Sequence, residues 1–217
     1  MRISLLSMKY MDEMERRLRE SGFATVRVEP NVSLYLLTSN LVDGAAISSV
    51  AALALGLEPC FCCPSVVSNG KVRNVVLIFK SKGDSNVIRL KVDKRSFTGR
   101  ALAFWYLSEQ GYEVVEVNDN EDVELLIGDE ARRVSGTKVD LGEVWYKEFS
   151  LPMVYALFVL RRRIPFPNIR YKWADISVVP LEEVLESLEV LKSLARYWSR
   201  PLLMPSGLLG LLLRSLK

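Results

Sequence analysis

A glycine and an acidic residue that follow a short apolar run are the first candidates for chemistry. Val123–Ile127 predicts a buried strand, and Gly128 and Asp129 come directly after it, where a short helix begins. Such a junction places main-chain N–H groups and a carboxylate at the carboxyl edge of a sheet, where open α/β folds bind ligands. We therefore expect Gly128 and Asp129 to line a ligand site.

Hydroxyl side chains stand at two further junctions between a strand and a helix. Ser48 and Ser49 end the predicted strand 44–47, and Ser96 and Thr98 open a helix that runs to Gln110. The first turn of a helix leaves N–H groups without intrahelical partners, so both junctions can bind a carboxylate. Capping of the two helices explains the same residues equally well. We expect Ser96 and Thr98 to receive one carboxylate of a dianionic ligand.

The chain offers few groups for acid–base or metal chemistry. Its 217 residues include no histidine, so the commonest general base and metal ligand is missing. Catalysis would depend on carboxylates, lysines, tyrosines, hydroxyls, backbone dipoles or groups of the substrate. Cys60, Cys62 and Cys63 are close together, but a structural zinc site needs four ligands. We expect these cysteines to be buried thiols in a strand, and we expect no metal site.

Composition favours a globular protein, and its mild positive charge would favour an anionic ligand if basic residues line a cleft. The hydrophobic fraction of 49% suffices for a packed core, and a net charge of +3 is too mild to indicate nucleic acid. No basic and apolar leader precedes the first strand, and the apolar tract 208–213 is too short to span a bilayer. We expect a cytoplasmic protein that does not bind membranes, and the oligomeric state stays open.

Basic and aromatic residues alternate between residues 161 and 173. This mixture is typical of some nucleic-acid-binding surfaces. It is more typical of a solvated connection whose aromatic side chains anchor it to the core, and we interpret it in that way. We therefore expect no nucleic-acid partner.

Strands and helices alternate along most of the chain, which predicts an α/β fold. Two long apolar runs, 72–79 and 154–160, each lie next to a predicted boundary between two lobes. We predict two lobes around a central cleft, the first from residues 1–80 and 155–217 and the second from residues 84–152. The first crossing between lobes is placed in the polar segment 80–85. The turn Ser68-Asn69-Gly70 predicts a hairpin or a tight crossover.

Several segments, in the right order, resemble signatures of one family. They are similar to the menaquinone-biosynthesis enzymes of the futalosine route, and within these to the chorismate dehydratases. The matching segments are VDGAAISS (42–49), SNGKVRNV (68–75), SFTGRAL (96–102), LLIGDEA (125–131), DLGEVW (140–145) and LPMVYALFVLR (151–161).

The resemblance implies a fold like that of type II periplasmic binding proteins and the dehydration of chorismate to 3-enolpyruvylbenzoate without a cofactor. It adds Ser68, Asn69 and Asn74 to the expected substrate-binding residues, and Arg73 as a further candidate whose alternative role is an ion pair. The family's first strand ends in an asparagine that reaches the substrate, whereas this chain has Ser7 and Met8 there. Val67 and Asn74 also replace family serines. A small-carboxylate-binding protein that has lost the chemistry is therefore the alternative.

Overall fold

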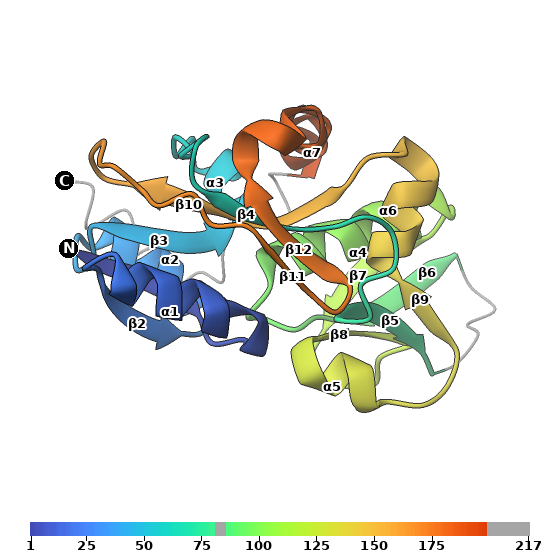
Figure 1. The fold of residues 1–217 in the computed structure, drawn as a ribbon. Coiled ribbons are helices and arrows are strands. Elements are labelled where there is room, and N and C mark those ends of the chain that lie inside the picture. The colour runs from blue at the N-terminus through green and yellow to red at the C-terminus, as the bar shows by residue number, and fades with distance from the viewer. Residues whose placement is uncertain (81–85, 199–217) are drawn as a thin grey trace.

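The computed structural model describes residues 1–80 and 86–198. In this part of the chain the strands form two sheets, each with helices packed on it, and the sheets lie side by side (Figure 1). The first sheet has the strand order β11-β12-β4-β10-β3-β1-β2, and the second has the order β7-β6-β8-β5-β9. The protein thus has the two-lobed α/β fold expected for type II periplasmic binding proteins. The predicted helix over residues 202–213 lies outside the described residues.

Lobe I is built on the first sheet, in which both parallel and antiparallel pairs occur. β1 pairs in parallel with β2 and β3, while β10 runs antiparallel to β3 and β4. Successive side chains of β3 point to opposite faces of the sheet and join two different core clusters. Ala46 packs on the face that α1 covers, and its neighbours Ala45 and Ile47 pack on the face that α2, α3 and α7 cover. Its elements are β1 (Arg2–Leu6), α1 (Asp12–Glu20), β2 (Ala24–Val28), α2 (Pro30–Thr38), β3 (Gly44–Ser48), α3 (Ser49–Ala54), β4 (Pro64–Ser68), β10 (Met153–Leu160), β11 (Tyr171–Trp173), β12 (Ile176–Pro180) and α7 (Leu185–Trp198).

Lobe II is built on the second sheet and is continuous in sequence. β5 runs antiparallel to β8 and β9, and β6 runs parallel to β7 and β8. Helix α4 of this lobe buries most of its apolar side chains, including Leu102 and Trp105. Its elements are β5 (Val75–Phe79), β6 (Val87–Lys91), α4 (Phe97–Glu109), β7 (Glu113–Val117), β8 (Val123–Ile127), α5 (Gly128–Arg133), β9 (Lys138–Asp140) and α6 (Leu141–Phe149).

The position of β5 corrects the predicted crossing between the lobes. β5 lies in the second sheet, so the chain leaves lobe I between Ser68 and Val75 and not at residues 80–85. The turn at Ser68 is accordingly a crossover and not a hairpin. Asp140 fixes this segment, because its carboxylate accepts the N–H groups of Val72 and Arg73 as well as those of the first turn of α6. An apolar run has the same pattern in either sheet, so sequence alone favoured the wrong lobe for β5.

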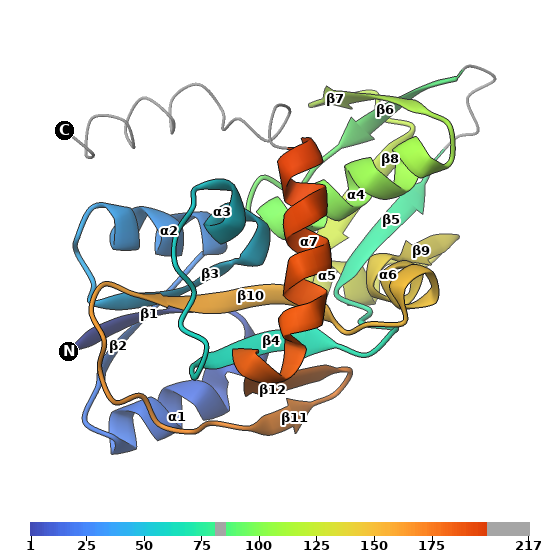
Figure 2. The same cartoon turned by 90° about the horizontal axis from the view of Figure 1, so that it is seen from above.

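Helix α7 extends over both lobes (Figure 2). It packs on α3 and β10 of lobe I and on α4 of lobe II, with Leu188 and Leu191 buried beneath it. The 161–173 segment is anchored by aromatic side chains, as predicted, since Phe166 packs on Phe23 and Phe158. No helix among the described residues is both long enough and apolar enough to span a membrane.

The cysteine segment is a turn that precedes β4, not the predicted strand of buried thiols. Cys60 and Cys63 form a disulfide, and the thiol of Cys62 is free and exposed. Pro59 and Pro64 flank the turn and lack the N–H groups that a strand would donate. The chain therefore joins the sheet only at Pro64, the first residue of β4.

Candidate functional site

A narrow cavity of about 60 Å³ lies between the two sheets, and it continues into a wider groove of about 450 Å³ at the surface. Met8, Tyr10, Asn74, Ile127 and Gly128 line both spaces. Together the two spaces are within the range of roughly 300 to 1,000 Å³ that is usual for small-molecule sites. We treat the cavity and the groove as one candidate site.

The cavity is predominantly apolar. It is lined by Leu6, Met8, Tyr10, Pro30, Ser48, Val66, Val72, Asn74, Val75, Ser96, Thr98, Ile127, Gly128, Tyr155, Ala156 and Ile176. The thioether of Met8 lies opposite Gly128, where an added β-carbon would come within 3.6 Å of the sulfur. Gly128 has a φ of 66°, which favours glycine at this strand–helix junction. A flat, largely apolar ligand such as a six-membered ring suits these walls.

The predicted hydroxyl residues form a chain of hydrogen bonds behind the cavity wall. The Thr98 hydroxyl donates to the main-chain carbonyl of Tyr155 at 2.9 Å. Each hydroxyl has one proton, so the 2.7 Å contact between Ser48 and Thr98 must use the proton of Ser48. Ser48 in turn accepts the N–H of Ala51 and caps α3. These protons are therefore already engaged in the protein.

A β-bulge explains why the hydroxyls are engaged there. The pairing of β10 with β4 shifts register between Val154 and Ala156, which leaves Tyr155 as the extra residue. Bulged carbonyls lack ladder partners, and Ser49 donates to Val154 O at 2.6 Å while Thr98 donates to Tyr155 O. The bulge also turns the Tyr155 ring toward the cavity, where Tyr155 is a lining residue.

Two tyrosines, Tyr10 and Tyr155, line the cavity. The Tyr155 hydroxyl lies 3.0 Å from Ser68 Oγ, which itself donates to Gly70 O. The hydroxyl of Tyr10 makes no hydrogen bond with any residue that the structure describes, and the ring is held by Trp173 at 6.2 Å between centroids. Burial raises the pKa of both phenols above the usual value, so both stay protonated at neutral pH.

One edge of the site is closed by contacts between the lobes. Arg132 of α5 donates to the Asn74 side chain and stacks over the Trp173 ring at 5.0 Å from its centroid. Asp175 lies between Arg132, at 3.9 Å, and Arg73, at 3.6 Å. Arg73 lines neither the cavity nor the groove. Of its two predicted roles, substrate binding and an ion pair, the structure shows the ion pair.

The groove has charges of both signs on its walls. Arg27 and Arg95 are paired with neighbouring carboxylates, whereas Lys9 and Arg133 have no carboxylate within ion-pair distance among the described residues. Lys9 and Arg133 are exposed at the rim and could attract an anion. The exposed Asp129 carboxylate also lines the groove, where it would repel an anion but accept a hydrogen bond from a hydroxyl.

The structure brings together most, but not all, of the residues chosen from the sequence. Ser48, Asn74, Ser96, Thr98 and Gly128 line the cavity, and Asp129 lines the groove. Ser49 and Ser68 stand behind the lining and bond to Thr98 and Tyr155. Asn69 is exposed in the crossover and lines neither space. Binding of a ligand by any of these residues stays a prediction.

Sequence reasoning missed the residues that shape the cavity most. Met8, Tyr10 and Tyr155 line the cavity, and Lys9 and Arg133, which were also missed, line only the groove. One feature of the sequence could have indicated Tyr155, because its hydroxyl is the single polar side-chain group in the apolar run 153–160. At Met8 the sequence shows only that the family's asparagine is absent. The contact between Met8 and Gly128 could not be predicted, because it depends on how the two lobes pack together.

Comparison with known proteins identifies the family. A family model described as menaquinone biosynthesis matches residues 8–197. The chain belongs to this menaquinone biosynthesis family. Membership agrees with the resemblance in the signatures at residues 125–131 and 140–145. No curated protein sequence matches the chain.

Comparison with solved structures shows which folds resemble that of this chain. Protein AF1704 from Archaeoglobus fulgidus is 15% identical, with a TM-score of 0.58 over 91% of this chain and 86% of that chain. This likeness shows a shared fold and nothing about activity. The alkanesulfonate-binding protein SsuA from Xanthomonas axonopodis, bound to MOPS, is 16% identical with a TM-score of 0.46, over 99% of this chain and 83% of that one.

Proposed function

We propose that this protein acts in menaquinone biosynthesis as a cytoplasmic lyase that dehydrates chorismate to 3-enolpyruvylbenzoate. The observation that carries the proposal is the mainly apolar cavity between the lobes, flanked by two protonated tyrosines, in a member of the menaquinone biosynthesis family. The walls suit the ring of chorismate. The groove suits its polar and charged substituents.

The reaction needs little chemistry from the protein. One ring proton and the ring hydroxyl leave as water, and the six-membered ring becomes aromatic, which supplies the driving force. A base must take the proton, yet the chain has no histidine and both tyrosines are protonated. The enolpyruvyl carboxylate of the substrate is the remaining base that the site can hold in reach, so positioning would provide much of the rate.

Tyr10 is the residue best placed to assist the departing hydroxyl. It lines both the cavity and the groove, and its own hydroxyl has no partner among the described residues. A protonated phenol can donate a hydrogen bond to the leaving oxygen. Tyr155 is tied to Ser68 and would instead orient the ring.

Carboxylates of the substrate can be held at two places. The main-chain N–H groups of Phe97 and Thr98 have no intrahelical partners, because both residues belong to the first turn of α4. The Ser96 side chain accepts the N–H group of Gly99 and leaves these two N–H groups uncapped. Lys9 and Arg133 can hold a second carboxylate at the rim of the groove. The expected partner is thus a small dianionic metabolite.

Turnover of chorismate tests the proposal directly. Purified protein is incubated with chorismate, and 3-enolpyruvylbenzoate is followed by mass and by the ultraviolet absorbance of its aromatic ring. The Tyr10→Phe variant should form product more slowly, and Tyr35→Phe, an exposed tyrosine on α2, serves as the matched control. Absence of product at high enzyme concentration would contradict the proposal.

The second candidate function is binding of a small carboxylate without catalysis. It is favoured by the end of the first strand, where the family that this chain resembles has an asparagine that reaches the substrate and this chain has Ser7 and Met8. Thermal unfolding with chorismate separates the two functions, since a ligand at 100 times its dissociation constant adds about 2.7 kcal/mol of stability. Stabilisation without product would favour the binder, and product would favour the enzyme.

A further inference from the structure

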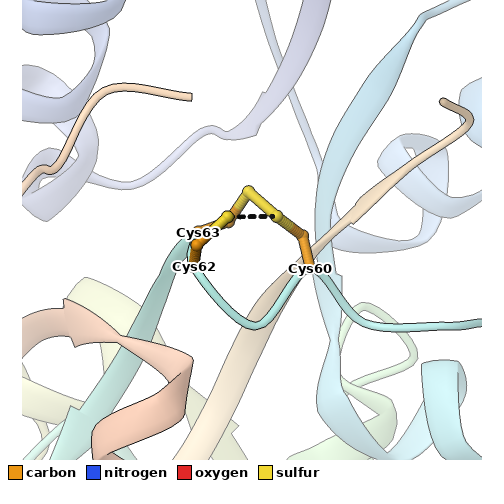
Figure 3. Close-up of side chains that lie close together, drawn as sticks. All are labelled: Cys60, Cys62 and Cys63. Carbon is orange, nitrogen blue, oxygen red and sulfur yellow. Dashed lines mark hydrogen bonds between the residues drawn. A yellow bond between two sulfur atoms is a disulfide. The ribbon is translucent and has the colours of Figure 1, made fainter. Parts of the chain in front are cut away.

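The three cysteines form a compact sulfur cluster in the turn before β4, and none of them lines the candidate site (Figure 3). The sulfur atoms of Cys60, Cys62 and Cys63 all lie within 4.8 Å of one another. Cys60 and Cys63 are joined as a disulfide, and the free Cys62 sulfur is 3.6 Å from that of Cys60. No part of the proposed lyase chemistry uses them.

The backbone holds this cluster together independently of the disulfide. Cys60 N donates to Phe158 O at 2.8 Å, which fixes the start of the turn to β10. Cys63 N donates to Cys60 O at 3.1 Å, and Cys63 O accepts from Leu181 N at 3.0 Å. Both ends of the turn are thus attached to other elements, so the three sulfurs should stay neighbours when the disulfide is reduced.

The cluster borders a groove of about 580 Å³ that carries positive charge. Cys60 and Cys62 line it together with Arg161, Arg162 and Arg163. Three thiolates around a monovalent cation carry a net charge of −2, and neighbouring guanidinium groups offset such a charge. Glu58 and Glu182 also line this groove, which leaves the arginines in excess by one charge.

We propose that, once reduced, Cys60, Cys62 and Cys63 bind one soft monovalent metal ion of the Cu(I) type through three thiolates. Metal–thiolate bonds of about 2.3 Å around a trigonal ion place sulfurs roughly 4 Å apart, and the turn already keeps the three sulfurs within 4.8 Å. All-sulfur donor sets favour Cu(I) among the ions available to proteins. Structural Zn²⁺ prefers four ligands, and the chain has neither a fourth cysteine nor a histidine.

The oxidation state of the cluster controls this binding. A dithiol reductant transfers two electrons and two protons to the Cys60–Cys63 disulfide, which yields two thiols and a cyclic disulfide. The metal ion then displaces three thiol protons and forms three metal–sulfur bonds. In the oxidised protein one thiol remains, so the site exists only in the reduced form.

Competition for Cu(I) tests the proposal with the full chain. The protein is reduced with a dithiol, desalted without air and titrated into the coloured Cu(I) complex of bicinchoninate. The reduced protein should remove one Cu(I) per chain, and the oxidised protein, which is the matched control, should remove none. Cys62→Ser should weaken binding by roughly 100-fold or more, and because Cys62 is exposed this variant should fold normally.

X-ray absorption of the loaded protein should show three sulfur neighbours around copper. Equal binding by the oxidised and reduced protein, or full affinity in Cys62→Ser, would overturn the three-thiolate site. Two sulfur neighbours would overturn it as well, as would uptake of Zn²⁺ while Cu(I) stays on the chelator. Chorismate turnover is measured separately, so failure here and failure of the proposed lyase activity can be told apart.

Discussion

The Thr98 hydroxyl donates a 2.9 Å hydrogen bond to the main-chain carbonyl of Tyr155, and this bond joins the two lobes at the cavity. Thr98 is the second residue of α4 in lobe II, and Tyr155 is the bulged residue of β10 in lobe I. One hydroxyl thus satisfies an unpaired carbonyl and fixes the N-terminus of α4 beside the ring of Tyr155. The position of both parts of the site depends on this contact.

Replacing Thr98 with valine should destabilise the protein. The buried Tyr155 carbonyl loses its main donor and the Ser48 hydroxyl loses its acceptor, and unsatisfied buried groups cost about 1 to 3 kcal/mol. Thr98→Ser keeps the hydroxyl and is the control, with an expected loss below about 1 kcal/mol. Urea unfolding measures both, and equal stability of Thr98→Val and the parent would refute the role given to this bond.

Replacing Tyr10 with phenylalanine should lower kcat for chorismate by roughly 100-fold or more with little change in KM. The phenol is expected to donate to the leaving oxygen mainly in the transition state, and acid–base assistance of this kind contributes about 100-fold or more. The parallel Tyr155→Phe variant removes the bond to Ser68, and it should raise KM instead. Steady-state kinetics of the two variants give the comparison; a rise in KM alone for Tyr10→Phe would assign this tyrosine to binding.

Replacing Met8 with asparagine should tighten carboxylate binding. The thioether opposite Gly128 would give way to an amide that can donate a hydrogen bond to a charged ligand, worth about 1.5 to 3 kcal/mol. We expect the dissociation constant for chorismate to fall by roughly tenfold or more, measured by calorimetry. Met8→Leu is the control, because it keeps the volume and adds no donor. If both variants bind alike, the absence of the asparagine does not limit this site.

The pKa of Glu13 should be about 2, because hydrogen bonds from Arg16 and Arg17 stabilise its carboxylate. The folded-state pKa lies below the ordinary value of 4.5, so this group stabilises the fold above about pH 4.5 and loses its contribution between there and pH 2. Carbon NMR titration measures the pKa directly. Arg16→Gln together with Arg17→Gln should return it toward 4.5.

A control for Glu13 lies on the same helix. Arg19 pairs with Glu15 at 2.7 Å rather than with Glu13, so Arg19→Gln should leave the pKa of Glu13 in place. An unchanged pKa in the Arg16/Arg17 double variant would show that the two arginines are not the cause. High salt should weaken the effect, since these pairs are exposed.

The ends of the strands can be predicted from the sequence, but the hydrogen bonds that form at these ends cannot. Apolar runs and capping residues are local signals, and they predict that Gly128, Ser48 and Thr98 lie at junctions between strands and helices. Their hydrogen-bond partners depend on the bulge at Tyr155, which arises only when β10 pairs with β4. No local pattern at residue 155 reports a register shift with a strand roughly 90 positions earlier.

Two other differences have similar causes. β5 is as apolar as a strand of lobe I, and only its partners β8 and β9 show which sheet contains it. Cysteines are among the most buried residue types, so a run of apolar residues and thiols favoured a strand. The prolines at 59 and 64 were the better guide to the turn, since each removes an N–H donor.

The place of β10 in the first sheet determines the order in which a nascent chain can complete its parts. β10 lies between β3 and β4, yet it is synthesised after the whole of lobe II. Lobe II is contiguous from β5 to α6, so it can collapse while the sheet of lobe I still lacks its central strand. A ribosome-bound chain that ends at residue 150 would therefore expose the edges of β3 and β4, which is the stage most open to aggregation.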